Sequence, residues 1–321
     1  MTSPRRLLKN ARRFTVYLLV AALVHTVRWL PYAWLRRLLP ALIGRVAPRF
    51  LRQDAFQSLT IAYGDQMDAA QREALLRRLC RHLGHLVAEL FHMHRQGGRF
   101  FDARVDSAQA RALLEPLFRS GRPVVGLTGH LGNWEMVAQQ FRLISGKTEF
   151  GVVGKELTNR WIDAMVVAHR RRSGLITLYQ HESPRKVLRS LEQYGIVGIV
   201  PDQDVDGLKG IFVPFFGHPA YTPVGPAWLA VKGKAVIAPT FLVREGDRLR
   251  VHCEPPIEAD PDATDQDAEI ERLTVAWSAA VERAIRRWPD QWMWFHRRWR
   301  TTPERLIRRG RGRNVRGPAL P

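Results

Sequence analysis

The chain has 321 residues, of which 45% are hydrophobic, and it carries a formal net charge of +20 at pH 7. This length and apolar content predict a sizeable folded core and exclude a wholly disordered chain. The two cysteines, Cys80 and Cys253, lie far apart and form no CxxC pair, which excludes a cysteine-based zinc or redox motif. We expect both to be reduced thiols in the core of a cytoplasm-facing domain.

The positive charge is concentrated at the two ends of the chain. Residues 1–53 contribute +11 and residues 291–321 contribute +8, which leaves +1 for the residues between them. A basic flank can bind nucleic acid or an anionic membrane surface. The first flank alternates its arginines with the apolar stretches Phe14–Val27 and Trp29–Ala47. That mixture favours a lipid surface, so we expect a membrane partner and no nucleic acid.

The apolar stretch Phe14–Val27 is shorter than the ~20 residues that a membrane span needs. Basic residues lie on both sides of it, which gives a span no clear orientation. A signal peptide is disfavoured because arginines follow the stretch and no A-x-A cleavage site is evident. We therefore predict a monotopic or shallowly inserted anchor at residues 1–50, with a single span as the alternative.

Helical patterns follow the anchor. Leucines recur at helical spacing within Asp54–His94, and one or two short helices are expected in Phe100–Ser120. A buried strand at Arg122–Leu127 then leads into the segment Thr128–Glu135. The helical pattern that begins there continues through Leu143.

Strands and helices alternate over the rest of the chain. Further strands are predicted at Phe150–Val153, Ile176–Tyr179, Ile196–Val200, Ala235–Val243 and Arg248–Cys253. Helices are predicted at Asn159–Arg172, Ser183–Tyr194, Val224–Lys232 and Ile270–Arg287, with a Gly- and Pro-rich loop before the third of them. This alternation predicts an α/β domain over residues 51–304, with a mostly parallel central sheet flanked by helices. Residues 305–321 are predicted to be a basic flexible tail.

Two chemically active side chains directly follow predicted strands. Ligands of such sheets bind beyond the carboxyl ends of the strands, where His130 and Asp202 are expected. The spacing of His130 and Glu135 lets a loop histidine reach a carboxylate in the first helical turn, and such a pair can deprotonate a hydroxyl. The alternative is a structural histidine beside a surface glutamate.

Other residues near these strand ends have two interpretations each. Arg170 could stabilise an oxyanion or lie on the surface, as we expect for Arg171 and Arg172. Asp202 and Asp204 could bind Mg²⁺ or Ca²⁺, but we favour no metal, with loop capping or ion pairs to arginines as the alternative. The Phe212, Phe215 and Phe216 rings could line an acyl-chain slot or pack in the core.

The second basic flank interleaves aromatic and basic side chains. Tryptophans at 292, 294 and 299 alternate with His296, Arg297, Arg298 and Arg300. This mixture suits a membrane headgroup or a phosphorylated sugar, and it also suits single-stranded nucleic acid or a packed edge. We favour phosphate contact by one or two of these arginines.

Four ordered blocks resemble the late acyltransferases of lipid A biosynthesis. They are Thr128-Gly-His-Leu-Gly-Asn-Trp-Glu135, Val200-Pro-Asp-Gln-Asp204, Gly210-Ile-Phe-Val-Pro-Phe-Phe-Gly-His-Pro-Ala220 and Pro289-Asp-Gln-Trp-Met-Trp-Phe-His-Arg-Arg-Trp-Arg300. Such a series is far more specific than any single short motif. The resemblance implies a glycerolipid-acyltransferase-like fold on the cytoplasmic face of the inner membrane. It also implies transfer from an acyl-acyl carrier protein to a hydroxyl of a lipid A precursor, without a cofactor.

The resemblance also implies roles for individual residues. His130 and Glu135 would form the catalytic pair, Arg170 would hold the thioester oxyanion or a lipid phosphate, and Asp202 would support the site. Substrate contacts are expected at Gly132, Asn133, Trp134, Gln203, Phe215, Arg297 and Arg298. The nearest alternative is the same reaction on another lipid, such as a phosphatidylinositol mannoside, an ornithine lipid or a lysophospholipid, with acyl-CoA as a possible donor. A nucleic-acid-binding protein and a non-catalytic membrane scaffold are the rivals from other classes.

Overall fold

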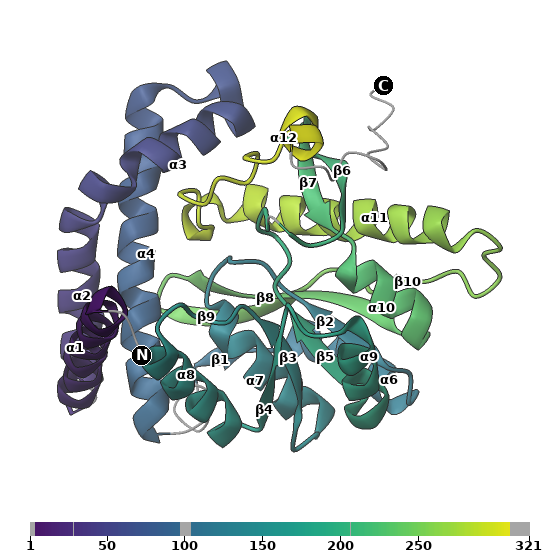
Figure 1. The fold of residues 1–321 in the computed structure, drawn as a ribbon, viewed down its shortest axis with the longest axis horizontal. Coiled ribbons are helices and arrows are strands. Elements are labelled where there is room, and N and C mark those ends of the chain that lie inside the picture. Colours follow the sequence, from purple (N-terminus) through teal and green to yellow (C-terminus); the bar gives the residue numbers. More distant parts are fainter. Residues whose placement is uncertain (1–3, 28, 97–103, 206, 309–321) are drawn as a thin grey trace.

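The computed structural model describes residues 4–27, 29–96, 104–205 and 207–308. It begins with the helices α1 (Pro4–Val27), α2 (Tyr32–Val46), α3 (Pro48–Tyr63), η1 (Gly64–Gln66) and α4 (Ala69–Gln96). These helices gather on one side of the sheet domain (Figure 1). The single helix predicted over Asp54–His94 is wrong, because the chain turns at Gly64, whose φ of 49° few other residues adopt.

Helices α2 and α4 cross at very short range. A Cβ atom built on Gly84 of α4 would lie 2.4 Å from the Cα of Pro40 in α2. Only a residue without a side chain allows this approach, so Gly84 fixes how closely the two helices pack. Among the described helices, none combines the length and the apolar character that a membrane crossing requires.

The sheet domain is built around parallel strands. The strands are β1 (Val105–Asp106), β2 (Val124–Leu127), β3 (Phe150–Gly154), β4 (Leu175–Tyr179), β5 (Ile196–Ile199), β8 (Val236–Glu245), β9 (Arg248–Cys253) and β10 (Ile257–Glu258). Their order in the sheet is β1-β9-β8-β2-β5-β3-β4, with β10 paired to β8. The pairs β8–β9 and β8–β10 are antiparallel and the others are parallel. The predicted mostly parallel α/β sheet is therefore confirmed.

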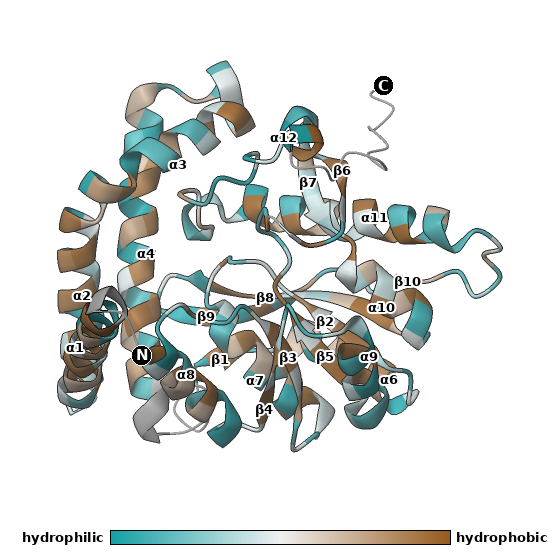
Figure 2. Cartoon of the chain, in the orientation of Figure 1, coloured by the Kyte–Doolittle hydropathy of each residue, from teal (hydrophilic) through white to brown (hydrophobic). Residues whose placement is uncertain are grey.

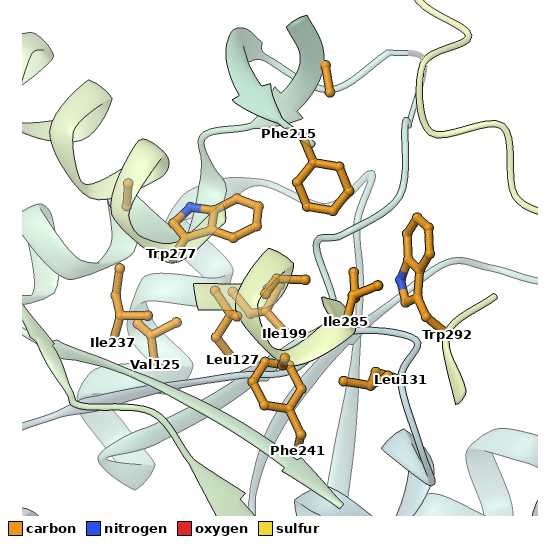
Figure 3. Packing of buried hydrophobic residues seen from close by; sticks show 14 of the residues in the cluster. Val125, Leu127, Leu131, Ile199, Phe215, Ile237, Phe241, Trp277, Ile285 and Trp292 are labelled. Carbon is orange, nitrogen blue, oxygen red and sulfur yellow. The ribbon is translucent and has the colours of Figure 1, made fainter. Parts of the chain in front are cut away.

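Helices cover both faces of this sheet. The covering helices come from α6 (Ala108–Arg119), α7 (Trp134–Ser145), α8 (Arg160–Arg172), α9 (Pro184–Tyr194), α10 (Gly225–Gly233) and α11 (Gln266–Arg287), and the described chain ends with α12 (Pro303–Arg308). The apolar faces of α6 and α7 share one core cluster with alternate strand residues, whereas α9, α10 and α11 share the larger cluster on the other face. Figure 3 shows part of the larger cluster, to which α11 contributes Trp277 and Ile285 and the sheet contributes Val125 and Ile237.

Two features of the C-terminal half differ from the prediction. The segment expected to be a Gly- and Pro-rich loop contains the antiparallel hairpin β6 (Gly210–Phe215) and β7 (His218–Pro223). It was missed because prolines disfavour strands; a two-stranded hairpin accepts them because each strand keeps a free edge. The first residues of the predicted tail belong to α12, whose Leu306 is buried against this hairpin. Residues 309–321 of that tail lie outside the described residues.

Candidate active site

His130 and Asp202 meet at the carboxyl ends of two neighbouring parallel strands. Leu127 ends β2 directly opposite Ile199, which ends β5. His130 and Asp202 each lie three residues further along the chain, so the strand register brings them together. The ring Nδ1 of His130 lies 2.7 Å from one Asp202 carboxylate oxygen, and the His130 backbone N–H donates to the other at 2.7 Å.

The expected hydrogen bond between His130 and Glu135 is not formed. Asp202 occupies the position at the histidine ring that the five-residue spacing assigned to Glu135. Glu135, in the first turn of α7, instead accepts hydrogen bonds from Arg170 of α8 at 3.2 and 3.4 Å. The site therefore contains two linked pairs, His130–Asp202 and Glu135–Arg170.

The Asp202 carboxylate is ionised although it is almost fully buried, with 1% of its surface exposed. Burial alone would raise its pKa, but His130, the indole N–H of Trp292 at 2.8 Å and the His130 backbone N–H together hold the pKa of Asp202 below its ordinary value. An ionised carboxylate only accepts hydrogen bonds, so the ring Nδ1 of His130 must carry a hydrogen. This leaves the Nε2 of a neutral His130 with a free lone pair.

The same contacts change the affinity of His130 for protons. Burial lowers the pKa of His130, but the charge and the hydrogen bond of Asp202 and the charge of Glu135 outweigh burial, so that this pKa lies above its ordinary value. A histidine of this kind is a stronger base than a free imidazole. It suits the removal of a proton from a hydroxyl.

His130 borders a cavity of about 570 Å³. Trp134 lines it beside the histidine, with the two ring centroids 5.3 Å apart. Apolar side chains such as Val153, Val166, Val200, Leu208 and Leu229 form much of the wall. A cavity of this size and character can hold a hydrocarbon chain of several carbons next to the polar reacting groups.

Both members of the second ion pair also line this cavity. Of the three consecutive arginines that end α8, only Arg170 reaches it, whereas Arg171 and Arg172 are exposed. The Arg170 guanidinium is held by Glu135 and directs a fixed positive charge into an apolar space. Such a charge can stabilise an anion that develops close to His130.

The chain matches the family model described as bacterial lipid A biosynthesis acyltransferase over residues 3–301. The protein belongs to this family. It is 30% identical over 196 residues to the lipid A biosynthesis lauroyltransferase of Escherichia coli (strain K12). This alignment covers 58% of this chain and 58% of that relative. It is 28% identical over 137 residues to the phosphatidylinositol mannoside acyltransferase of Mycobacterium tuberculosis (strain CDC 1551 / Oshkosh), which covers 41% of this chain and 42% of that relative.

Two of the expected substrate contacts line the cavity of this acyltransferase family member, and two others do not. Trp134 and Gln203 both face the cavity. Asn133 is buried and donates its side-chain N–H to Glu89 of α4. Gly132 has a φ of 61°, and a Cβ atom on it would lie 2.1 Å from the Leu242 carbonyl oxygen. Gly132 and Asn133 join the turn that carries His130, residues 128–133, to the protein interior, and their contact with substrate stays a prediction.

The residues of the second basic flank that were predicted to contact phosphate have protein partners, and phosphate contact stays a prediction. Arg298 is buried and donates to the Tyr221 carbonyl and the Thr222 hydroxyl of β7. Phe215 lies in the core beside the Arg298 guanidinium, outside the cavity lining. Arg297 is half-exposed and forms an ion pair with Asp54 at 2.8 Å. The interpretation of this segment as a packed edge fits these residues, because each of them contacts other groups of the protein.

Asp204 binds the C-terminal segment of this family member. Its carboxylate accepts hydrogen bonds from the backbone N–H and the hydroxyl of Thr301, and Arg300 forms an ion pair with it. This agrees with the alternative of ion pairs between these aspartates and the C-terminal arginines. Over the described ranges, no cluster of three or more His, Cys, Asp or Glu side chains is arranged as a metal site.

Sequence reasoning missed several residues that form the site. Trp292 donates its indole N–H to Asp202, whereas the sequence pattern assigned it only to a mixed aromatic and basic block with several interpretations. Lys155, Tyr179 and Trp228 also line the cavity, but each follows or lies within an element that gives no sequence signal of a site. Their positions depend on how α8, β4 and α10 pack around the cavity.

Proposed function

We propose that this protein transfers a fatty acyl chain from an acyl thioester, carried by acyl carrier protein, to a hydroxyl of a lipid A precursor. One observation supports this most strongly: the His130 ring, bound to Asp202 through Nδ1, borders a largely apolar cavity that also contains Arg170. Membership of the lipid A acyltransferase family supports the same reaction and the same class of acceptor.

The proposed reaction is a direct transfer. The Nε2 of His130 takes the proton of the acceptor hydroxyl while the oxygen attacks the thioester carbonyl and forms the new C–O bond. The C–S bond then breaks, and His130 returns the proton to the leaving thiolate. Asp202 stabilises the imidazolium that exists between these two steps. No Ser or Cys nucleophile lines the cavity within the described residues, which favours direct transfer.

Arg170 has a separate role in this proposal. Negative charge develops on the thioester carbonyl oxygen during attack, and a fixed guanidinium in an apolar cavity stabilises it. Glu135 holds the guanidinium in place at 3.2 Å. In this scheme Glu135 acts on Arg170, and its charge also supports the protonated form of His130.

Mass spectrometry of lipid A from cells with and without this gene tests the proposal. We expect one acyl chain to be missing without the gene and to be restored by the wild type and by Arg172→Ala. His130→Ala and Arg170→Ala should not restore it. Arg172 is the matched control because it is an exposed arginine of the same helix. Unchanged lipid A in the deletion strain would contradict the proposed acceptor.

A second acceptor is supported by one comparison. Two relatives from Mycobacterium tuberculosis, 28% and 29% identical over 137 residues, are named phosphatidylinositol mannoside acyltransferases. The same His130 chemistry would serve a mannoside hydroxyl, with acyl-CoA as a possible donor. A comparison of all lipids in the two strains separates these acceptors, because the lipid that loses an acyl chain identifies the substrate.

We further propose that the N-terminal helices hold the enzyme on the cytoplasmic surface of the inner membrane. Exposed apolar side chains recur along α1 to α3: Leu7, Leu8, Phe14, Leu18, Leu19, Leu23, Trp29, Trp34, Leu38, Leu42 and Phe50. Figure 2 shows hydrophobic and hydrophilic segments alternating along these helices. Helix α1 is attached to α8, because the Asn159 side chain donates to the Arg13 carbonyl at 2.7 Å and Phe14 contacts Trp161. The apolar surface therefore adjoins the helix that carries Arg170.

Sedimentation with anionic lipid vesicles tests this attachment. The double variant Leu19→Glu with Leu42→Glu should remain in the supernatant, because it places charge in the apolar surface. The control Gln193→Glu with Thr264→Glu adds the same charge at exposed positions in α9 and before α11, across the sheet domain from α1 and α2 (Figure 1), and should sediment like the wild type. Equal sedimentation of both variants would contradict the proposed surface.

A further inference from the structure

A buried carboxylate of α4 reaches the catalytic turn from behind. Glu89 is 1% exposed and accepts a hydrogen bond from the Asn133 side chain at 2.7 Å. It also forms an ion pair with Arg244 of β8. Burying two charges costs desolvation energy, so a pair of this kind is weak evidence for stability alone. Its contact with the turn that carries His130 points to a different role.

Asn133 is the residue through which Glu89 contacts this turn. It is the N-cap of α7 and lies between His130 and Glu135 in the chain. An asparagine at this position usually accepts a hydrogen bond from a backbone N–H of the first helical turn. Here the side chain makes no such bond and donates to Glu89 instead. The Asn133 side chain thus binds α4, and its contact with α7 is to the Met136 sulfur at 3.1 Å rather than to a backbone N–H of the first turn.

Backbone bonds fix the same turn from two other directions. The Asn133 N–H donates to the Leu242 carbonyl of β8 at 2.7 Å, and the Gly132 N–H donates to the Gln291 carbonyl at 3.0 Å. The Gln291 side chain in turn exchanges two hydrogen bonds with the backbone of Arg244. Arg244 therefore links the partner of Asn133 to the segment that holds Gly132.

His82 adds a second contact between α4 and the turn. It lies seven residues before Glu89, so both side chains project from the same face of the helix. Burial lowers the pKa of His82 to about 4, while the nearby Gly132 carbonyl acts in the opposite direction. His82 is therefore neutral at pH 7. Within the described part of α4, the negative charge beside the Asn133 side chain comes from Glu89.

We propose that Glu89 is a positioning residue for acyl transfer: it holds Asn133, and through Asn133 it fixes the turn that places His130 and Glu135 at the cavity. The kinetic test of this role rests on the proposed function. The NMR titration of His130 in the free enzyme does not depend on that function. Glu89 lies behind the turn and does not line the cavity, so it acts without touching substrate.

The kinetic test is a double-mutant cycle on the full-length protein with Glu89→Gln, Asn133→Ala and both changes together. Each single variant should lower kcat about 10- to 100-fold, as expected when reacting groups are misplaced by about 1 Å, with KM within twofold. The double variant should be no slower than Asn133→Ala alone, because both changes break one connection. Glu73→Gln, which removes an ion-pairing carboxylate from the same helix, should keep wild-type kinetics. If the losses in kcat of the two single variants multiplied in the double variant, the proposal would be overturned.

The second test follows the His130 ring by NMR titration of the free enzyme. In folded Glu89→Gln and Asn133→Ala, the His130 titration should move toward that of a free imidazole, because a displaced turn loosens its contact with Asp202. A role confined to global stability would leave this titration unchanged in the folded protein, and that result would overturn the proposal. If the wild type transfers no acyl chain to lipid A, the proposed function fails, yet this titration still tests the role of Glu89.

One further variant covers the case in which Glu89→Gln does not fold. That change leaves Arg244 as an uncompensated buried charge, which destabilises proteins strongly. The double change Glu89→Gln with Arg244→Gln removes both charges. This folded variant should lose as much kcat as Asn133→Ala, and wild-type kcat would overturn the proposal.

Discussion

The Asp202 carboxylate binds His130 twice, with one oxygen 2.7 Å from the ring Nδ1 and the other 2.7 Å from the backbone nitrogen. The first contact fixes which ring nitrogen carries the hydrogen. The second fixes the position of the backbone from which the ring projects. Together they orient the His130 ring and raise its affinity for protons.

The first prediction concerns the pH dependence of catalysis. A general base must be neutral, so wild-type kcat/KM should rise with pH through the pKa of His130, which lies above its ordinary value of about 6.5. Asp202→Asn should move this inflection to lower pH and reduce the plateau by about 100-fold or more. A pH profile of kcat/KM for both proteins provides the measurement. An unchanged inflection would exclude Asp202 as the cause of the raised pKa.

The second prediction concerns stability and pH. A raised pKa of His130 in the folded state stabilises the protein below the pKa of the unfolded histidine, and this contribution is lost as pH rises through the folded-state pKa. Asp202→Asn should therefore lower the free energy of unfolding more at pH 5.5 than at pH 9. Urea unfolding at the two pH values measures this difference. The control Asp247→Asn removes a largely exposed carboxylate, and it should change the free energy of unfolding equally at the two pH values.

The third prediction concerns the Glu135–Arg170 pair. If Glu135 acts by holding Arg170, then Glu135→Gln and Arg170→Gln should each reduce kcat by about 10- to 1,000-fold, and the double variant should lose little more than Arg170→Gln alone. Steady-state kinetics of the three variants provide the cycle. Independent, multiplying losses would show that Glu135 has its own role at His130, as the five-residue spacing suggested.

The fourth prediction concerns the crossing of α2 and α4. Gly84→Ala places a Cβ atom 2.4 Å from the Pro40 backbone, which cannot move as a flexible side chain could. We expect a loss of about 1–3 kcal/mol in the free energy of unfolding. Gly225→Ala is the control, because its added Cβ atom meets open space. Chemical unfolding measures the stability of both variants. If Gly84→Ala were as stable as Gly225→Ala, the two helices would separate without cost.

The fifth prediction concerns the cysteines. Burial raises the pKa of the Cys80 thiol and of the Cys253 thiol to about 11 each. Because the thiolate is the reactive form, neither should react with iodoacetamide at pH 8 in the native protein. Both should react once guanidinium unfolds the chain. Mass spectrometry counts the modified cysteines, and rapid native labelling of either one would contradict its placement in the core.

The sequence predicted the body of the fold because its elements have clear local signals. The helices predicted to start at Asn159 and Ser183, for example, do start there, and these two residues are the N-caps of α8 and α9. Parallel strands also placed His130 and Asp202 at the same edge. Neither spacing nor propensity could show that β2 and β5 are direct neighbours, so the partner of His130 was assigned to the carboxylate that is nearer in sequence.

The C-terminal block shows a second limit of sequence reasoning. Alternating tryptophans and arginines have the composition of a phosphate-binding surface, and only tertiary packing shows that Arg298 binds β7 and that Trp292 binds Asp202. Figure 3 shows Trp292 within the larger core cluster, near Leu131 of the catalytic turn. Buried polar partners of this kind carry no local sequence signal.

The place of Trp292 in the chain has a consequence for biosynthesis. The indole that binds Asp202 lies 90 residues after it, and a ribosome adds residues from the N-terminus onward. The strands that carry His130 and Asp202 can form while the rest is still being translated. The Asp202 carboxylate, however, gains its complete set of partners only after residue 292 has left the ribosome, so we expect a nascent or truncated chain to lack the complete site until the folded domain is nearly finished.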